Sequence, residues 1–243
     1  MSRPPRVSPP RVAPDALRRS VVLGALPQEE LAELARRMRG RTYRRGERIV
    51  RQGEPGDALY VLLRGRVKVV AETASGEEPV LTVLGPGELF GEMALLDGGP
   101  RAATVVALEA VHAAVLGRDD FRALLRRSPD AAERVLASLT GMIRRTSQQI
   151  TDLLALTIPA RLAKKLLELG AAHGRAVGRG ANGTDVVAIE VPLTQEDLAA
   201  MVGGTRPTIN KLLGTYEAAG AIVRAGRRIT IVQPEILRRL AGG

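Results

Sequence analysis

The sequence contains no cysteine and no tryptophan, and its five tyrosine and phenylalanine residues are Tyr43, Tyr60, Phe90, Phe121 and Tyr216. The lack of cysteine excludes disulfide bonds, thiolate metal sites, cysteine-ligated iron–sulfur clusters and thiol nucleophiles. Because aromatic residues are scarce, leucine, valine, isoleucine and alanine must form the cores. Apolar residues make up 45% of the chain, which is enough for one large domain or two ordinary ones.

Long apolar runs are also absent from the sequence. No run approaches the ~18 residues that a helix needs to span a bilayer, and the N-terminus lacks the apolar segment of a signal peptide. We therefore expect a soluble, cytoplasmic protein with no membrane partner, which agrees with the lack of cysteine.

Groups that could carry catalysis or bind a metal are scarce. The two histidines are isolated, since His112 lies in a strand-like alternation and His173 in a loop, and neither is near a serine or a carboxylate cluster. Hydrolytic triads and zinc sites need such clusters, and a haem-sensing protein needs a ligating histidine or cysteine. We therefore predict no catalytic residue, no metal site and no resident cofactor, and we interpret the chain as a binding protein rather than an enzyme.

The net charge of +10 is unevenly distributed along the chain. Residues 1–20 hold 5 basic residues and 1 acidic residue, residues 21–158 hold 19 and 18, and residues 159–243 hold 12 and 7, so the three segments carry +4, +1 and +5. A near-neutral middle beside a basic C-terminal third favours binding of a polyanion by the C-terminal part. A solvated surface in an arginine-rich proteome is the alternative that charge alone leaves open.

The N-terminal half contains three kinds of pattern. The start, MSRPPRVSPPRVAP, is rich in proline and poor in apolar residues, which predicts a disordered basic tail over 1–20. In LPQEELAELARRM the apolar residues have helical spacing, which predicts a short amphipathic helix. Over 42–115 short β-branched runs alternate with glycines, and this pattern predicts a compact antiparallel sheet folded on itself.

A long helix is predicted after this sheet, over 128–157. Ser128 is placed to cap its start, and a proline occupies the first helical position. One apolar stripe steps by three and four residues, and a second repeats every seven, at Leu136, Ile143 and Ile150. About 28 residues make ~40 Å of helix, more than one small sheet covers, so we favour packing of the second stripe against a second copy of the chain. Burial of the helix wholly within one chain is the alternative.

The C-terminal part contains two helices around a tight turn, in VPLTQEDLAAMVGGTRPTINKLLGTYEAAGAI. Thr157 is a candidate cap for the helix that opens this part, and GRAVGRGANGTD is interpreted as a glycine-rich loop. Thr194 with Asp197 forms a capping box, and Gly203 supplies the positive φ of the turn. Thr205 is placed to cap the second helix.

The second helix leaves polar side chains on its outer side that suit base edges and phosphates. After it, AIVRAGRRITIV predicts two short strands around a basic turn with Arg224, Arg227 and Arg228, which is typical of a wing beside the DNA backbone. The predicted DNA-binding residues are Thr194, Thr205, Arg206, Thr208, Asn210, Lys211, Arg227 and Arg228.

Together these segments resemble the Crp-Fnr family over about residues 25–235. Members of this α+β family have an N-terminal cyclic-nucleotide-binding β-roll, a long dimerisation helix and a C-terminal winged helix-turn-helix. Within GERIVRQGEPGDALYVLLRGRVKV, the family's β-roll pattern is matched at Gly46, Glu47, Gln52, Gly53, Gly56, Asp57, Tyr60 and Gly65. The resemblance implies a β-roll domain over 21–127, a dimerisation helix and hinge over 128–157, and a DNA-binding domain over 158–243.

The resemblance also places a ligand site in GELFGEMALLDGGPRAAT. In similar proteins the glycine at the place of Gly91 opens a turn, the glutamate at Glu92 accepts from the ribose 2′-hydroxyl, and the arginine at Arg101 pairs with the cyclic phosphate. A guanidinium and a carboxylate suit these two partners. Mutual pairing of Glu92 and Arg101 in a ligand-free pocket is the alternative. The ligand-binding residues implied in this way are Gly91, Glu92, Met93, Arg101, Ala102, Thr146 and Ser147.

Thr146 and Ser147 match the pair that meets the adenine in cyclic-AMP-responsive regulators, one residue from each subunit. A polar pair in an apolar seam is costly unless it is satisfied, although a threonine can bond to its own helix backbone. Ala102 stands where many bacterial regulators have serine or threonine. However, FGEMALLDGGPRAAT resembles the cassette of the regulatory subunits of cyclic-AMP-dependent protein kinase, where this alanine is normal and is associated with cyclic AMP over cyclic GMP.

Two positions depart from the pattern of the best-known cyclic-AMP regulators. Pro207 stands where they have a glutamate in the recognition helix, so the resemblance implies no operator sequence. Thr157 stands where they have an aspartate at the hinge, and both residue types can cap a helix.

The sequence therefore predicts a homodimeric, sequence-specific DNA-binding transcription regulator that is allosterically controlled by cyclic AMP. Its implied partners are double-stranded DNA, the cyclic nucleotide, a second copy of the chain and RNA polymerase. A regulator that responds to cyclic GMP, to cyclic di-GMP or to no ligand is the first alternative. A signalling subunit that uses only the nucleotide domain is the second, and the winged motif argues against it.

Overall fold

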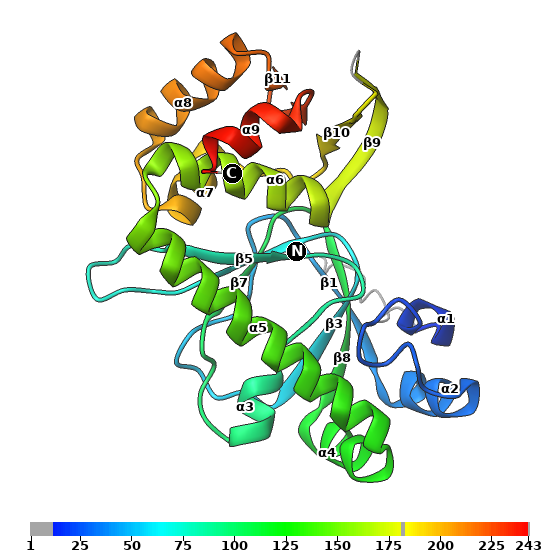
Figure 1. Ribbon diagram of the computed structural model, residues 1–243. Coiled ribbons are helices and arrows are strands. Elements are labelled where there is room, and N and C mark those ends of the chain that lie inside the picture. The colour runs from blue at the N-terminus through cyan, green and yellow to red at the C-terminus, as the bar shows by residue number, and fades with distance from the viewer. Residues whose placement is uncertain (1–11, 181–182, 243) are drawn as a thin grey trace, which may run out of the picture. The chain divides into compact units, whose positions relative to one another are not determined.

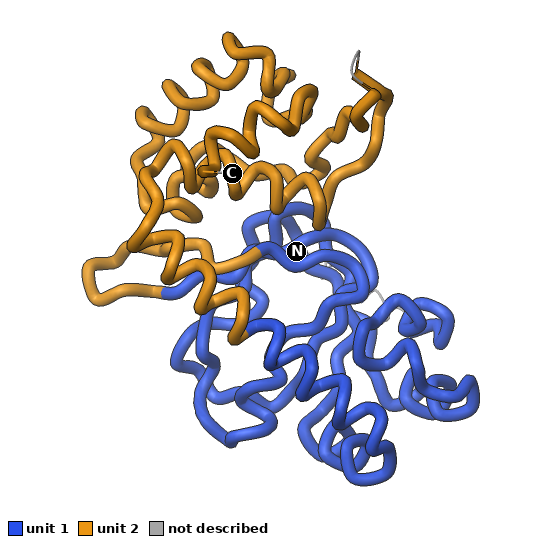
Figure 2. The backbone as a smooth tube through the Cα atoms, viewed as in Figure 1, with its two compact units in different colours: residues 1–71, 83–142 blue, residues 72–82, 143–243 orange. Residues whose placement is uncertain are grey.

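The computed structural model describes residues 12–180 and 183–242, and the chain forms two compact units. The first unit comprises Met1–Ala71 with Val83–Met142, and the second comprises Glu72–Thr82 with Ile143–Gly243 (Figure 2). The long helix α5, Pro129–Ala155, begins in the first unit and ends in the second (Figure 1). The architecture of antiparallel sheets, a long helix and a C-terminal helix-turn-helix confirms the predicted α+β class.

Two four-stranded antiparallel sheets contribute to the first unit (Figure 1). One has the order β1-β8-β3-β6, with bounds Arg39–Tyr43, Val111–Gly117, Ala58–Arg64 and Leu89–Phe90. The other has the order β2-β7-β4-β5, with bounds Arg48–Val50, Thr104–Ala107, Val67–Val70 and Val80–Leu84, and β5 crosses the boundary between the units. The antiparallel sheets expected from the glycine-punctuated β-branched runs are thus present.

Successive side chains of a strand point to opposite sides, and strand β3 has buried side chains on both of them. Leu59 and Val61 belong to the core that contains Phe121 and Leu124 of helix α4, Arg118–Arg127. Leu62 faces the opposite way, into the core between the two sheets. Leucine, valine and alanine fill most of both cores, as the scarcity of aromatic residues requires.

The predicted tail is shorter than its boundary at residue 20. Residues 1–11 lie outside the described part of the chain, whereas helix α1, Pro14–Leu17, packs beside α2, Gln28–Arg37. Leu17 is fully buried and Val12 is 8% exposed. The prediction of disorder over 12–20 is therefore wrong, because two apolar side chains in a polar segment are enough to anchor it to the core.

The helix caps of the C-terminal half follow the sequence prediction. Ser128 Oγ accepts a hydrogen bond from the Ala131 amide at 3.3 Å and caps α5. Thr157 caps α6, Ile158–His173, and its hydroxyl accepts from the Ala160 amide at 3.5 Å. His173 is the last residue of this helix rather than part of a loop.

The second unit contains a four-stranded sheet with the order β11-β12-β10-β9. The strands are Ile222–Ala225, Arg228–Ile231, Asp185–Ile189 and Gly174–Arg179. The segment interpreted as a glycine-rich loop begins with β9, which pairs antiparallel to β10, so that interpretation is wrong for 174–179. Glycine permits but does not enforce a loop, and here the backbone hydrogen bonds of β10 determine its conformation.

The remaining helices are α3, Glu92–Asp97, α7, Gln195–Val202, α8, Arg206–Ala218, and α9, Pro234–Leu240. Helices α3, α4 and α9 were not predicted from the sequence, because six to ten residues give few repeats of a helical period. None of the helices in the described ranges is both long and apolar enough to cross a membrane.

Replacement of Leu17 by alanine tests whether the N-terminal segment is part of the core. Leu17→Ala removes a fully buried side chain and should lower the free energy of unfolding by about 2–5 kcal/mol. Val21→Ala is the matched control, because Val21 is 64% exposed and its change should stay within about 0.5 kcal/mol. Urea unfolding of the full chain followed by circular dichroism measures both, and equal stability of the two variants would show that residues 12–20 do not contribute to the core.

Candidate functional site

The turn that opens α3 requires glycine for two reasons. Gly91 is the N-cap of this helix and has a φ of 89°, a left-handed conformation that side chains rarely adopt. A Cβ at this position would also lie 2.5 Å from Arg101 Nη1. The same crowding applies at Gly56, whose Cβ would lie 2.9 Å from Arg101 Cζ. Both glycines therefore make room for one guanidinium.

Arg101 is 5% exposed, and its guanidinium has fixed partners in the first unit. Nη1 donates to the Gly91 carbonyl at 3.0 Å, and Nη2 donates to the Ala58 carbonyl at 2.8 Å. The guanidinium carbon lies 5.7 Å from the centre of the Tyr60 ring, which stacks on Phe90 with 4.8 Å between centroids. These contacts orient the cation but supply no negative charge, and burial of an unneutralised charge is unfavourable.

Glu92 follows Gly91 and is a candidate counter-charge for Arg101. Burial raises the pKa of its carboxyl group, and the positive charge of Arg101 lowers it by less. No ion pair within 4 Å joins Glu92 and Arg101 in the structure described, so the alternative in which these two groups pair directly is not observed. Met93 and Ala102 are exposed beside them. The structure thus brings five of the seven predicted ligand residues together.

Thr146 and Ser147, the other two predicted ligand residues, lie on α5 in the second unit and are exposed. The hydroxyls of Thr140 and Thr151 donate to carbonyls four residues earlier in this helix, at 2.8 and 3.1 Å. Thr146 forms no such bond within the described residues. Its hydroxyl is therefore available to another molecule.

The helix-turn-helix forms through the predicted caps. Thr194 and Asp197 form a capping box at the start of α7, and Gly203 ends this helix with a φ of 65°. Thr205 caps α8, and its hydroxyl accepts from the Thr208 amide at 3.4 Å. Because Ile209 and Leu213 are buried, the opposite side of α8 must face outward.

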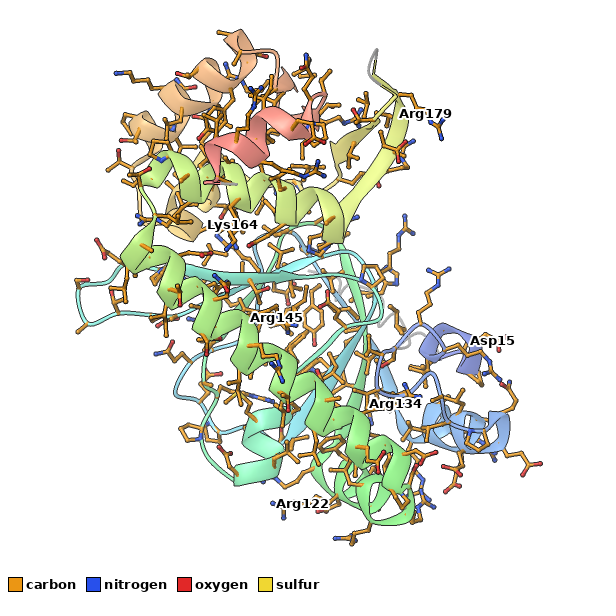
Figure 3. All side chains as sticks on the ribbon, viewed as in Figure 1. Asp15, Arg122, Arg134, Arg145, Lys164 and Arg179 are labelled. Atoms are coloured by element: carbon orange, nitrogen blue, oxygen red, sulfur yellow. The ribbon has the colours of Figure 1, made fainter. Side chains whose placement is uncertain are left out.

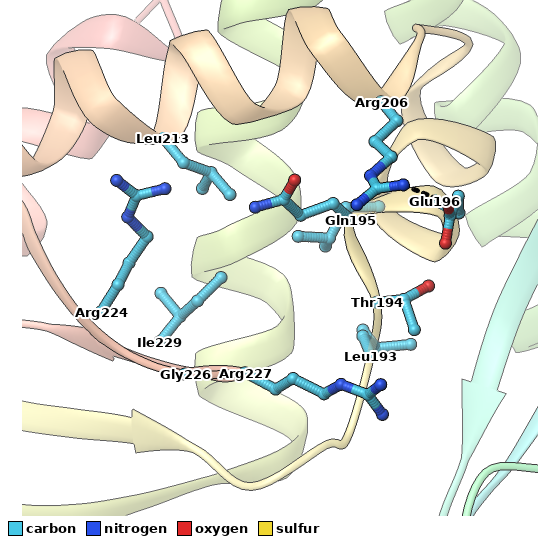
Figure 4. Close-up of a pocket in the computed structure, with 11 residues that line it drawn as sticks. Leu193, Thr194, Gln195, Glu196, Arg206, Leu213, Arg224, Gly226, Arg227 and Ile229 are labelled. Carbon is cyan, nitrogen blue, oxygen red and sulfur yellow. Dashed lines mark hydrogen bonds and ion pairs between the residues drawn. The ribbon is translucent and has the colours of Figure 1, made fainter.

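Seven of the eight residues predicted to bind DNA belong to α8 with its N-cap or to the β11–β12 hairpin, namely Thr205, Arg206, Thr208, Asn210, Lys211, Arg227 and Arg228. Thr208 is half-buried, and its hydroxyl lies 2.9 Å from that of Thr205. The eighth, Thr194, is half-buried and caps α7 instead. Arg206 is exposed and forms an ion pair with exposed Glu196 at 3.2 Å (Figure 4). Asn210 and Lys211 are exposed on the next turn of α8. Arg227 and Arg228 are exposed at the turn of the hairpin. A cavity of roughly 240 Å³ lies between the start of α7, α8 and this hairpin.

Two polar residues near α8, Gln195 and Glu217, were not predicted from the sequence, whereas Arg224 was placed in the basic wing but not among the DNA-binding residues. Gln195 and Arg224 both donate to Asn210 Oδ1, at 3.2 and 3.4 Å, and Glu217 binds Arg224 through its carboxylate. The position of Arg224 in the predicted wing was the only available signal, since its partners are distant in sequence. In the described ranges no group of three or more histidine, aspartate or glutamate side chains could hold a metal ion.

Comparison with known proteins identifies both parts of the chain. Residues 40–128 match the cyclic nucleotide-binding domain family, and residues 160–240 match the Crp-like helix-turn-helix domain family. A CRP-like cAMP-activated global transcriptional regulator of Mycobacterium tuberculosis is 32% identical over 227 residues, which are 93% of this chain and 99% of that protein. The cyclic AMP receptor protein of Thermus thermophilus is 33% identical, over 84% of this chain and 88% of that protein.

Solved structures have the same fold. A CRP-family transcriptional regulator of Thermus thermophilus superimposes with a TM-score of 0.67 at 28% identity, over 84% of this chain and 97% of the other. FixK2 of Bradyrhizobium japonicum superimposes with a TM-score of 0.72 at 21% identity, over 84% and 96% of the two chains, which shows the fold alone. With both domains matched and nearly full-length relatives above 30% identity, the chain belongs to the Crp-Fnr family of transcriptional regulators.

Proposed function

We propose that this regulator is a homodimer that binds cyclic AMP in the β-roll and then binds its operator DNA more tightly. The observation that carries the proposal is the buried guanidinium of Arg101, which is oriented by two carbonyls and an aromatic ring but has no anionic partner within 4 Å. A cyclic phosphodiester supplies one negative charge and oxygens that accept from a guanidinium.

The neighbouring residues support a cyclic nucleotide rather than an inorganic anion. Glu92 would accept from a ribose hydroxyl, a group that an inorganic anion does not carry. The exposed Ala102 leaves the recognition of the phosphate to backbone N–H groups, as the resemblance to the kinase regulatory subunits implies. Two of the similar regulators are described as cAMP-activated or as a cyclic AMP receptor, which favours the adenine nucleotide.

The homodimer proposal rests on the exposed apolar stripe of α5. Leu136, Ile143 and Ile150 repeat every seven residues and are 62%, 63% and 54% exposed. A heptad repeat is the pattern by which two helices pack along their length. A second copy of α5 would bury these side chains and would bring two copies of Thr146 and Ser147 to one seam.

The basic charge of the C-terminal residues supports the DNA-binding part of the proposal. Residues 159–243 hold 12 basic and 7 acidic residues, and Arg206, Lys211 and Arg228 are exposed. Such a surface attracts the phosphate backbone, and a dimer would present two recognition helices to a two-fold symmetric site. RNA polymerase is the further partner that the family relationship suggests.

Replacement of Arg101 tests the ligand and its effect on DNA together. Arg101→Ala should weaken cyclic AMP binding by at least roughly 30-fold, because it removes the charged donor from a buried site. It should also abolish the increase in DNA affinity that cyclic AMP causes in the unchanged protein. Calorimetry measures the first effect, and fluorescence anisotropy with a labelled operator measures the second.

Arg64→Ala is the matched control for Arg101→Ala, since Arg64 is exposed on β3. Cyclic GMP and cyclic di-GMP are titrated beside cyclic AMP. No heat with cyclic AMP, together with DNA binding that is unchanged by it, would contradict the proposed effector. Binding of another nucleotide that Arg101→Ala removes would assign the same pocket to that nucleotide.

The pH dependence of binding tests the role of Glu92. Burial raises the pKa of this carboxyl group, so it is protonated at a higher pH than an exposed glutamate. If the carboxylate accepts the ribose hydroxyl, cyclic AMP affinity should fall as the pH decreases through this raised pKa. Glu92→Gln should bind more weakly at neutral pH and should lose this pH dependence.

As the pH changes, the folding stability of the ligand-free protein should change in the opposite direction to its affinity for cyclic AMP. The folded chain binds the Glu92 proton more tightly than the unfolded chain, so the contribution of Glu92 to stability decreases as the pH rises through its folded-state pKa. At neutral pH the ligand-free Glu92→Gln variant should therefore melt no lower than the unchanged protein. Calorimetric affinities and melting curves over the acidic pH range measure both effects, and identical pH profiles of the two proteins would contradict the assigned role.

A charge in the seven-residue repeat tests the homodimer. Ile143→Asp would bury a carboxylate between two helices, so the dimer should dissociate to monomers in sedimentation velocity runs. Arg145→Asp is the control, because Arg145 is exposed outside the repeat and projects from the middle of α5 (Figure 3). A wild-type protein that sediments as a monomer, or an Ile143→Asp variant that remains dimeric, would contradict the predicted seam.

A further inference from the structure

Asn210 is exposed on the recognition helix α8, and its side-chain oxygen has two partners. Gln195 Nε2, at the start of α7, donates to Asn210 Oδ1 at 3.2 Å. Arg224 Nη1, on strand β11, donates to the same oxygen at 3.4 Å. The amide oxygen of Asn210 therefore faces the protein from two sides.

Arg224 is held firmly in this position by Glu217. Its Nε and Nη2 donate to Glu217 Oε2 at 2.9 and 2.8 Å, and its backbone amide donates to Oε1 at 2.9 Å. The hydrogen bond from Arg224 lowers the pKa of Glu217, so the carboxylate persists at acidic pH.

The chemistry of arginine decides the orientation of the Asn210 amide. A guanidinium can only donate, so the atom of Asn210 that faces Arg224 must be the carbonyl oxygen. Gln195 must then present its own amide nitrogen to that oxygen. The Asn210 amide nitrogen has no acceptor among the described residues. Its two N–H donors are left to face outward.

We propose that Arg224, positioned by Glu217 and assisted by Gln195, fixes Asn210 as a donor-only reader of base edges, which selects guanine or thymine over adenine and cytosine. This inference rests on the proposed binding of α8 in a major groove. Arg224 and Gln195 act in it as positioning residues, and Asn210 is the specificity-determining residue.

The selection follows from the hydrogen-bonding pattern of the major groove. Guanine offers the acceptors N7 and O6, and thymine offers O4, so an outward N–H group matches either base. Adenine also offers the acceptor N7, but its N6 donor lies beside it and opposes a second N–H group, and the occupied oxygen of Asn210 prevents the two-point contact in which asparagine accepts from N6 and donates to N7. Cytosine offers an N4 donor, which an N–H group does not match.

Selection of duplexes from a randomised pool tests the inference on the full-length protein with cyclic AMP present. Sequencing of the bound fraction from the wild-type protein and from Asn210→Ala identifies the base pair in each half-site whose preference depends on Asn210. The wild-type protein should prefer guanine or thymine there by about fivefold or more, which is the low end for a specific base contact. Asn210→Ala should lose that preference.

Two further variants change the outward group in opposite ways. Asn210→Asp keeps an acceptor for Arg224 and Gln195 but presents oxygen instead of N–H to DNA, so the preference should move to cytosine or adenine. Arg224→Met removes the guanidinium and frees the amide to turn, so adenine should gain at the same base pair. Arg239→Met removes one exposed charge from α9 and is the matched control, which should keep the wild-type preference.

The outcomes separate this inference from the proposed function. A pool with no enriched duplex would overturn the DNA-binding proposal and this inference with it. Two outcomes would overturn this inference and leave the DNA-binding proposal intact. One is enrichment of adenine at the base pair whose preference depends on Asn210. The other is an unchanged base preference in both Arg224→Met and Asn210→Asp. Melting curves and cyclic AMP titrations of each variant establish that a lost preference is not a loss of folding.

Discussion

The ligand site depends on one constraint, which is that the guanidinium of Arg101 is buried without a neutralising acid. Two carbonyls and the Tyr60 ring orient this group. The geometry around it explains residues that have no chemistry of their own, since Gly56 and Gly91 leave space that any side chain would fill. A site of this kind is unfavourable when empty, because the charge is desolvated, and becomes favourable when an anion enters. In the proposed site the same constraint would link ligand affinity to pH through Glu92, a half-buried residue whose carboxyl pKa is raised by burial and lowered by less by the charge of Arg101.

In the second unit, arginine side chains donate hydrogen bonds to backbone carbonyl groups that helices leave unpaired. The last carbonyls of a helix have no partner within it. Arg161 donates to Leu156 and Leu153 near the end of α5, at 2.8 and 3.1 Å, and to Val202 at the end of α7, at 2.9 Å. One side chain thus joins two helix ends. A forked, permanently charged donor suits this role, and Arg224 uses the same property to join Glu217 to Asn210.

The sequence predicted those features that depend on local chemistry. The caps at Ser128, Thr157, Thr194 and Thr205 each use a side chain within three residues of its partner, and the structure has all four. The glycine-rich segment that forms β9 was predicted incorrectly, because its conformation is determined by hydrogen bonds to β10. The family relationship drew together Gly91, Glu92 and Arg101. No local pattern could have shown that Arg101 would be satisfied by carbonyls, or that Arg224 and Gln195, which lie far apart in the sequence, would meet at Asn210.

The hydrogen bonds that orient Asn210 gain importance because of Pro207, which lies three residues earlier in α8. Proline has no N–H group and reads no base, so it removes one reading position from the first turn of α8. Of the polar residues predicted to contact DNA on this helix, Arg206 is paired with Glu196, whereas Asn210 and Lys211 are exposed one turn later. Arg206 must leave an ion pair before it contacts DNA, although an exposed pair of this kind contributes little. Asn210 needs no such rearrangement, because Arg224 and Gln195 already orient it. If α8 reads DNA as proposed, a proline near the start of the helix shifts more of the base discrimination to Asn210, whose orientation is fixed in advance.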